Sequence, residues 1–179
     1  MNDATAAQRA LLPPLQSTML DRLISFLKSL PDTGADKRAP SADDPRVAAA
    51  ALMFHVVNAD GVLEDSEKAQ LRQTLSRAYS LTGGALDALV EAGEAAEREA
   101  IDLYAFTRVL RRELDAEARL KFIGLLWEMA YADGRADELE DNVVWRIAEL
   151  IGVDSRDRIA ARQRIKASIA GASDGPGVE

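Results

Sequence analysis

The sequence predicts an all-α protein, a helical bundle of about seven to eight helices with two pseudo-symmetric repeats. Three observations lead to this prediction. Apolar residues recur three and four positions apart along most of the chain, which is the spacing of one helix face. Alanine is abundant and aromatic residues make up only 5% of the chain, which favours closely packed helices over β-sheets. One segment also occurs twice in similar form.

The chain of 179 residues divides by composition into three parts. Residues 1–43 should hold an N-terminal amphipathic helix, centred on residues 19–30, and a flexible linker rich in Pro, Gly and Asp. Residues 44–170 should form the helical domain, and residues 171–179 a disordered tail. We expect the N-terminal helix to dock on its own domain or on a partner. Peripheral membrane association is the less favoured alternative, because membrane-surface helices carry more Lys and Arg.

Periodicity and capping residues predict the helices of the domain in order. Apolar residues at helical spacing indicate helices over residues 45–58, 65–80 and 84–97. Asp102 and Asp115 are natural N-caps for the next two helices, the second of which covers residues 116–131. A further helix over residues 138–151 should end at Gly152, and a last one should cover residues 155–169.

Composition argues against several classes of function. The chain has no cysteine, so a disulfide, a thiolate zinc site, an iron–sulfur cluster or a cysteine nucleophile is excluded. Its net charge of −8 repels a phosphate backbone, so nucleic acid is not an expected partner. The Arg residues near the C-terminus are interleaved with acids and indicate a solvated helix face. Without a transmembrane-length apolar run or a signal peptide, we expect a cytoplasmic protein.

The most informative feature is an internal repeat, in which residues 54–67 align without gaps onto residues 127–140. Each copy has an aromatic residue, an Asp-Gly pair six positions later, and a Glu seven positions after the Asp. The Gly is suited to the left-handed conformation that ends a helix, and the Glu falls in the first turn of the next helix. Each copy is therefore expected to form a helix–turn–helix junction.

These junctions predict a metal site at Asp60, Glu67, Asp133 and Glu140. If a pseudo-twofold axis brings the junctions together, the four carboxylates converge, and oxygen ligands suit hard cations such as Ca²⁺ or Mg²⁺. The competing interpretation is that the acids only cap helices. Asp137 and Glu140 resemble a capping box, Glu64 and Glu67 a weaker one, and acids in a first turn are favoured by the helix dipole. The residues alone leave both interpretations open.

The only histidine, His55, lies one turn before Asp60, and Glu128 occupies the matching position in the second copy. The two side chains are candidates for additional ligands. A single histidine without cysteine does not make a typical zinc site, so a half-exposed helical histidine is the simpler interpretation. An EF-hand does not fit, because its Gly and Glu fall at different distances from the first Asp.

The two Ala-Asp-Gly junctions, each with a Glu seven residues after the Asp, resemble the tellurite-resistance TerB family. The matching elements are residues 58–63 with Glu67, residues 131–134 with Glu140, and the helix opened by residues 101–103 between them. The resemblance covers residues 44–153 and implies a bundle of about seven helices in two pseudo-symmetric halves, with a link to tellurite resistance or a wider stress response. It also implies a metal or interaction site at the paired acids. Where the first junction has Val62 and Leu63, the second has Arg135 and Ala136, so the second turn should be more polar.

The expected function is that of a non-enzymatic binding or scaffolding module with a protein partner, tuned by a divalent cation. No Gly-rich phosphate loop, Ser/His/Asp grouping or cofactor fingerprint is present to indicate an enzyme. A metal-dependent hydrolase that uses the carboxylates around Mg²⁺ is one alternative, and a purely structural interaction domain is another. Homodimerisation is left open by the sequence.

Overall fold

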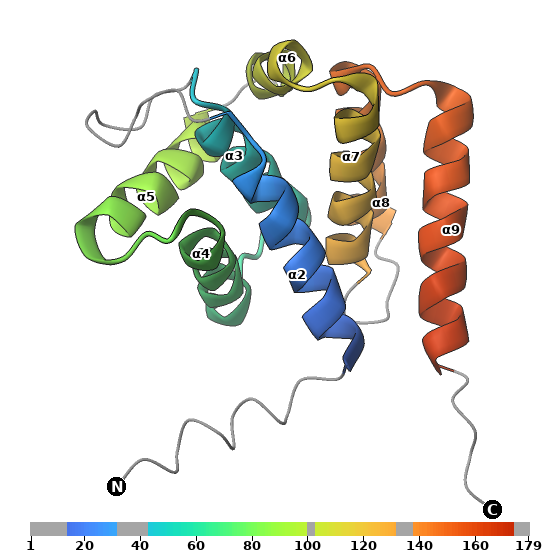
Figure 1. The fold of residues 1–179 in the computed structure, drawn as a ribbon, viewed down its shortest axis with the longest axis horizontal. Helices are drawn as coiled ribbons and strands as arrows, with labels where there is room; N and C mark the ends of the chain where they lie inside the picture. Colours follow the sequence, from blue (N-terminus) through green and yellow to red (C-terminus); the bar gives the residue numbers. More distant parts are fainter. Residues whose placement is uncertain (1–13, 32–42, 100–102, 132–137, 174–179) are drawn as a thin grey trace, which may run out of the picture.

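The computed structural model describes residues 14–31, 43–99, 103–131 and 138–173 (Figure 1). These ranges contain eight α-helices and no β-strand, which confirms the all-α prediction. Within these ranges no helix is long and apolar enough to cross a membrane. The helices are α2 (Pro14–Lys28), α3 (Pro45–Val57), α4 (Asp65–Tyr79), α5 (Gly83–Glu99), α6 (Tyr104–Glu113), α7 (Ala116–Ala130), α8 (Glu138–Ile151) and α9 (Ser155–Ser173).

Local capping chemistry explains several of the helix boundaries. The side chain of Asp115 accepts a hydrogen bond from the backbone N–H of Ala118 at 2.8 Å, as predicted for the start of α7. Gly152 ends α8 with φ at 86°, also as predicted. Several boundaries differ from the prediction: α2 begins at Pro14 and α5 covers Gly83–Glu99, and the start of α6 and the end of α9 also differ. Leu103 is the N-cap of α6, one residue after Asp102, which lies outside the described residues. Helix α9 continues to Ser173, because Gly171 disfavours but does not forbid a helix.

Helix α3 is the centre of the bundle and contacts α4, α5, α6, α7 and α8. Its residues from Pro45 to Phe54 are all buried and, except for Arg46, all apolar, as expected for a helix at the centre of a core. Four consecutive alanines, residues 48–51, allow close approach to neighbouring helices. A Cβ added at Gly93 of α5 would lie only 3.0 Å from the Cβ of Ala50, so α3 and α5 are packed as tightly as small residues permit.

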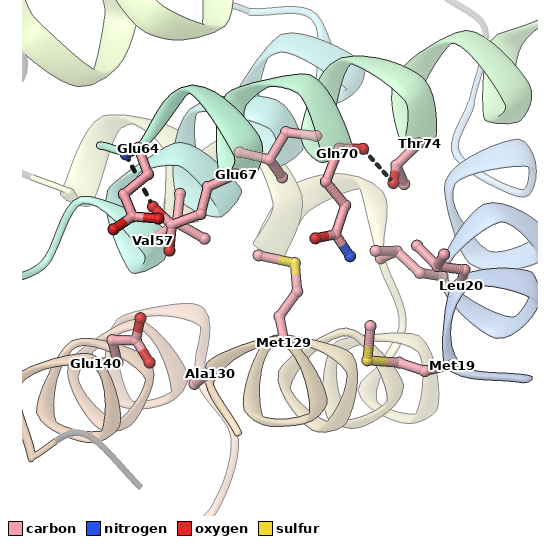
Figure 2. A pocket seen from close by; sticks show the side chains of 12 residues that line it. Met19, Leu20, Val57, Glu64, Glu67, Gln70, Thr74, Met129, Ala130 and Glu140 are labelled. Atoms are coloured by element: carbon pink, nitrogen blue, oxygen red, sulfur yellow. Dashed lines mark hydrogen bonds between the residues drawn. The ribbon is translucent and has the colours of Figure 1, made fainter. Parts of the chain in front are cut away.

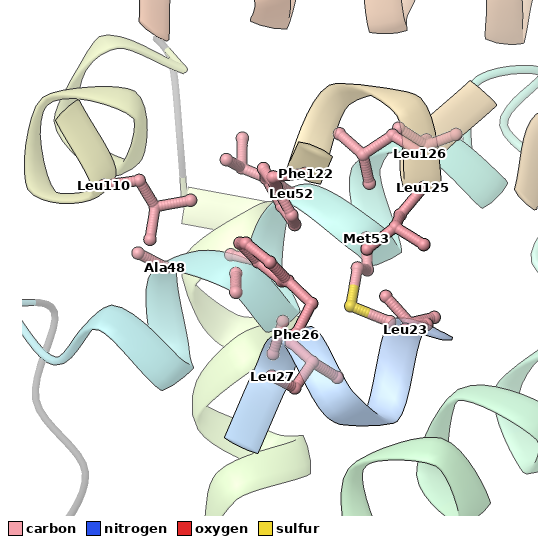
Figure 3. Packing of buried hydrophobic residues seen from close by; sticks show 14 of the residues in the cluster. Leu23, Phe26, Leu27, Ala48, Leu52, Met53, Leu110, Phe122, Leu125 and Leu126 are labelled. Carbon is pink, nitrogen blue, oxygen red and sulfur yellow. The ribbon is translucent and has the colours of Figure 1, made fainter. Parts of the chain in front are cut away.

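Helix α2 packs into the same core as the helices of the predicted domain (Figure 3). Leu23, Phe26 and Leu27 are fully buried, and the Phe26 ring stacks on Phe122 of α7 with 5.3 Å between centroids. The helix contacts α4 and α7. Of the two docking sites expected for the N-terminal helix, its own domain or a partner, the structure shows the first. The predicted boundaries at residues 43–44 and 170–171 stay predictions.

Most of the contacts between helices occur in matched pairs. Helix α2 contacts α4 and α7, while α6 contacts α8 and α3. Helix α3 contacts α4 and α5, while α7 contacts α8 and α9. This pattern is what two repeats of four helices, α2–α5 and α6–α9, would produce. The two pseudo-symmetric repeats remain a prediction, which the matched contacts favour.

Candidate functional site

The first junction turns from α3 to α4 through Asp60 and Gly61. Gly61 has φ at 81°, the left-handed conformation that lets the chain change direction after a helix. Asp60 is exposed, and its Oδ1 accepts a hydrogen bond from the backbone N–H of Val62 at 2.9 Å. The Asp60 carboxylate therefore stabilises the turn itself.

Glu67 lies in the first turn of α4 and closes a capping box. Its carboxylate accepts a hydrogen bond from the backbone N–H of Glu64 at 3.1 Å, which satisfies one amide at the start of the helix. The pair that the sequence indicated only weakly is thus present. A carboxylate has two oxygens and several lone pairs, so this bond leaves Glu67 with further capacity to accept.

The second junction is described only in part. Residues 132–137, which include the predicted ligand Asp133 and the predicted cap Asp137, lie outside the described residues. Glu140 is half-buried in the first turn of α8. It stands at the position in α8 that Glu67 occupies in α4.

A pocket of about 370 Å³ lies between the two junctions. One wall is α4, the opposite wall consists of the end of α7 and the start of α8, and α2 closes one side (Figure 2). Glu64 and Glu67 of the first copy and Glu140 of the second line this pocket together. The remaining lining residues are Met19, Leu20, Leu23, Val57, Gln70, Leu71, Thr74, Met129 and Ala130.

The structure thus brings two of the four predicted ligands, Glu67 and Glu140, to one pocket. Asp60 is not among the residues that line it, and Asp133 is outside the described residues. In the described parts of the chain, no group of three or more His, Cys, Asp or Glu side chains is arranged to hold a metal ion. The donor chemistry suits Ca²⁺ or Mg²⁺, but the described carboxylates alone do not complete a coordination shell.

A comparison with known protein families matches residues 46–163, well over half of the chain, to the family described as Tellurite resistance protein TerB. The chain belongs to the TerB family. The match includes both junctions and every pocket residue except those of α2. It confirms the resemblance inferred from the paired motifs. Searches of curated proteins and of solved structures gave no significant match.

In this TerB domain His55 and Glu128, which occupy matching positions before the two junctions, contact different helices. His55 is half-exposed, as predicted, and its Nδ1 lies 3.4 Å from Oε1 of Glu97 on α5. Asn58 donates to the same oxygen at 3.3 Å. Glu128 is buried and forms an ion pair with Arg22 of α2. Neither His55 nor Glu128 lines the pocket, and their contacts instead connect α3 with α5 and α7 with α2.

Burial raises the pKa of Glu128, and the nearby Arg22 guanidinium opposes this shift without cancelling it. The second carboxylate oxygen, Oε2, is buried and has no hydrogen-bond partner among the described residues. This glutamate therefore depends on α2 for the neutralisation of its charge. A contact between residues 106 positions apart has no local signature, so the sequence did not reveal it.

The basic residues of α9 in this TerB domain are not simply a solvated face, which corrects the sequence-based interpretation. Arg162 forms an ion pair with Asp141 of α8, and Tyr131 also donates a hydrogen bond to Asp141. The Arg158 guanidinium lies 4.8 Å from the centre of the Trp145 ring. These contacts attach α9 to the rest of the domain.

The same cluster raises the pKa values of Tyr131 and Arg162 and lowers that of Asp141. Burial and the hydrogen bond to Asp141 raise the pKa of Tyr131 to about 12. Burial alone would raise the pKa of Asp141, but the hydrogen bonds from Arg162 and Tyr131 outweigh it and lower the pKa. Asp141 therefore stays charged in the fold and anchors α9 electrostatically.

Proposed function

We propose that this TerB domain is a non-enzymatic binding module of a tellurite-resistance or wider stress-response system, and that the pocket between its junctions binds a cation. The observation behind the proposal is that Glu67 and Glu140, the matching acids of the two motif copies, line one pocket. Separate helix caps would not need to face the same cavity. The duplicated motif and the shared pocket thus support a single binding site formed by both motif copies, and not two unrelated helix caps.

The charge of the pocket favours a positively charged ligand. Three of its twelve described lining residues are glutamates, and none is Lys, Arg or His. Tellurite is an oxyanion and would be repelled by these carboxylates, since like charges in a partly desolvated pocket interact strongly. The link to tellurite resistance is therefore proposed to act through a cation or a partner, and not through capture of the oxyanion in this pocket.

A divalent cation, Ca²⁺ or Mg²⁺, is the proposed cofactor. Glu67 and Glu140 would supply carboxylate oxygens from the two sides of the pocket, and Asp60 and Asp133 would complete or orient the shell from the two turns. The separation of Asp60 from the pocket lining and its bond to Val62 count against a role as direct ligand. We therefore assign the larger effect on affinity to Glu67 and Glu140.

The first test is a titration of chelator-treated protein with Ca²⁺, Mg²⁺ and Zn²⁺, followed by tryptophan fluorescence and thermal melting. Trp127 on α7 and Trp145 on α8, with ring centroids 6.3 Å apart, report on the helices that flank the second junction. A cation at one hundred times its Kd stabilises the fold by about 2.7 kcal/mol, a rise in Tm of about 5–11 °C. If the double variant Asp60→Asn/Asp133→Asn shows the same rise in Tm as the wild type, the site is restricted to the two glutamates. No rise with any ion would refute the proposed cofactor.

A purely structural role is the main competing function, and specific bonds favour it. Asp60 holds the first turn and Glu67 caps α4, so both have a use without any ligand. Under this interpretation the domain acts only through its surface. Val62, which follows Gly61 of the first junction, and Leu139, which precedes Glu140, are 62% and 51% exposed and are candidate contacts for a protein partner.

An enzymatic role has less support from the pocket. Its described lining offers carboxylates but no nucleophile paired with a base, and its other walls are mostly apolar. A phosphoester or nucleotide turnover assay in the presence of Mg²⁺ tests this point directly. Turnover that disappears in Glu140→Gln would replace the binding-module proposal with a metal-dependent hydrolase.

A further inference from the structure

The pocket has two chemically different ends. Figure 2 shows Glu64, Glu67 and Glu140 together at one end and Met129 in the middle. Met19 and Leu20 of α2 lie at the other end, where the Gln70 amide points into the space (Figure 2). Leu23 and Leu71 add further apolar surface. A bare divalent cation would use only the acidic end and leave the apolar end without a function.

The pocket is also elongated. Glu67 and Thr74 both line it and are seven residues apart on α4, which corresponds to about 10 Å at a rise of 1.5 Å per residue. Its volume of about 370 Å³ lies in the range of small-ligand sites. An extended aliphatic chain advances about 1.2 Å per bond, so about eight bonds span this distance.

These features select one class of small ligand. An anion is repelled by the glutamates, and an uncharged apolar molecule makes no use of them. An alkylammonium ion matches both ends, because its head donates up to three hydrogen bonds to carboxylates while its methylene chain covers apolar side chains. Met19 and Met129 suit such a chain, since the thioether side chain adapts to the shape of its neighbour.

We propose that this pocket binds a primary aliphatic amine, with the ammonium group between Glu67 and Glu140 and the chain along Leu71 and Met129 toward α2. The proposal rests on the proposed function in one respect, that the pocket is the binding site of the domain. The alkylammonium group belongs either to a free aliphatic monoamine or to a lysine side chain of a protein partner. The chemistry at the glutamates is the same for both sources.

The test is isothermal titration with n-hexylamine, n-octylamine and a short peptide with a single lysine, at fixed ionic strength. Hexan-1-ol and sodium hexanoate are matched controls for the chain without the charge and with the opposite charge. We expect saturable binding of the two amines and none of the two controls. Tighter binding of the peptide than of either amine would identify a partner's lysine as the source. Binding of the alcohol as tight as that of hexylamine would overturn the role of the carboxylates.

Two variants locate the amine, with a control for each. Glu140→Gln should weaken amine binding about tenfold or more, whereas Glu138→Gln, at an exposed position in the same turn, should not. Gln70→Phe should fill the apolar end and weaken amine binding by a similar factor. Because Gln70 is exposed, the variant should stay folded. Gln73→Phe, exposed on the same helix and not part of the pocket lining, is its control.

The outcome separates this proposal from the proposed function. Ca²⁺ or Mg²⁺ binding that depends on Glu140, without amine binding, would overturn the amine proposal and leave the cation module standing. Amine binding that both Glu140→Gln and Gln70→Phe leave unchanged would place the amine elsewhere and overturn the proposal. Amine binding lost in Gln70→Phe, with divalent-cation binding retained, would support both proposals at once.

Discussion

Replacement of Phe26 by alanine tests whether α2 is an integral part of the core. Phe26 is 1% exposed and stacks on Phe122 at 5.3 Å, so its removal leaves a cavity between α2 and α7. Substitutions of this kind cost about 3–5 kcal/mol, and for a domain of this size we expect Tm to fall by about 6–20 °C. Ser25→Ala, an exposed neighbour on the same helix, should change Tm very little.

The assay is circular dichroism at the helix minimum, during heating and in a urea titration. Because α2 shares one hydrophobic cluster with the other helices, a single cooperative transition should shift as a whole. A loss below about 1 kcal/mol would refute the reasoning, because a fully buried aromatic side chain cannot be that dispensable. An early separate transition, with the main one unmoved, would equally show that α2 is an appended helix.

Three further predictions concern charges. Arg22→Ala should cost about 1–3 kcal/mol at pH 7, because it leaves the buried Glu128 unpaired. Since the folded-state pKa of Glu128 is raised, protonation of this residue at low pH favours the fold. The loss in unfolding free energy caused by Arg22→Ala, measured by urea titration, should therefore be smaller near pH 4 than at pH 7. Arg162→Met should cost about 1–3 kcal/mol at pH 7, with exposed Arg164→Met as a neutral control. The pKa of Asp141 is lowered in the fold, so its charged form stabilises the fold at any pH above its ordinary pKa. This stabilisation is lost as the pH falls through the lowered pKa. If the cost of Arg162→Met does not change with pH, the ion pair is not the cause of that cost. Glu67→Ala should cost about 0.5–2 kcal/mol through the lost cap, and Glu67→Gln much less, because the amide oxygen can still accept from Glu64. If Glu67→Gln retains both stability and full cation affinity, the residue is a cap and not a ligand.

Local chemistry in the sequence predicted the helices well. Asp115 and Gly152 mark helix ends through bonds and backbone angles that involve only their own neighbours in the chain. Gly171 shows the limit of such rules, since α9 passes through it to Ser173. The duplicated motif was also visible, because a repeat is a property of the sequence alone.

The pocket could be predicted only in part. Its acidic end followed from the repeat, which placed Glu67 and Glu140 at matching positions. Its apolar end did not, because Met19 and Leu20 come from α2, far away in the sequence. The same limit applies to Arg162, whose charge indicated a solvated face although Asp141 on another helix binds it. Contacts between helices depend on their arrangement in space, which no local pattern encodes.

The central claim is that the pocket between the two junctions binds a cation through the paired glutamates. Isothermal titration of chelator-treated protein with Ca²⁺ and with Mg²⁺ tests it most directly, in the wild type, Glu140→Gln and Glu138→Gln. We predict saturable binding with a Kd below about 1 mM for at least one of the ions. Glu140→Gln should weaken this binding about tenfold or more, and Glu138→Gln should not. Equal binding by all three proteins, or no binding to a fully folded wild type, would contradict the claim.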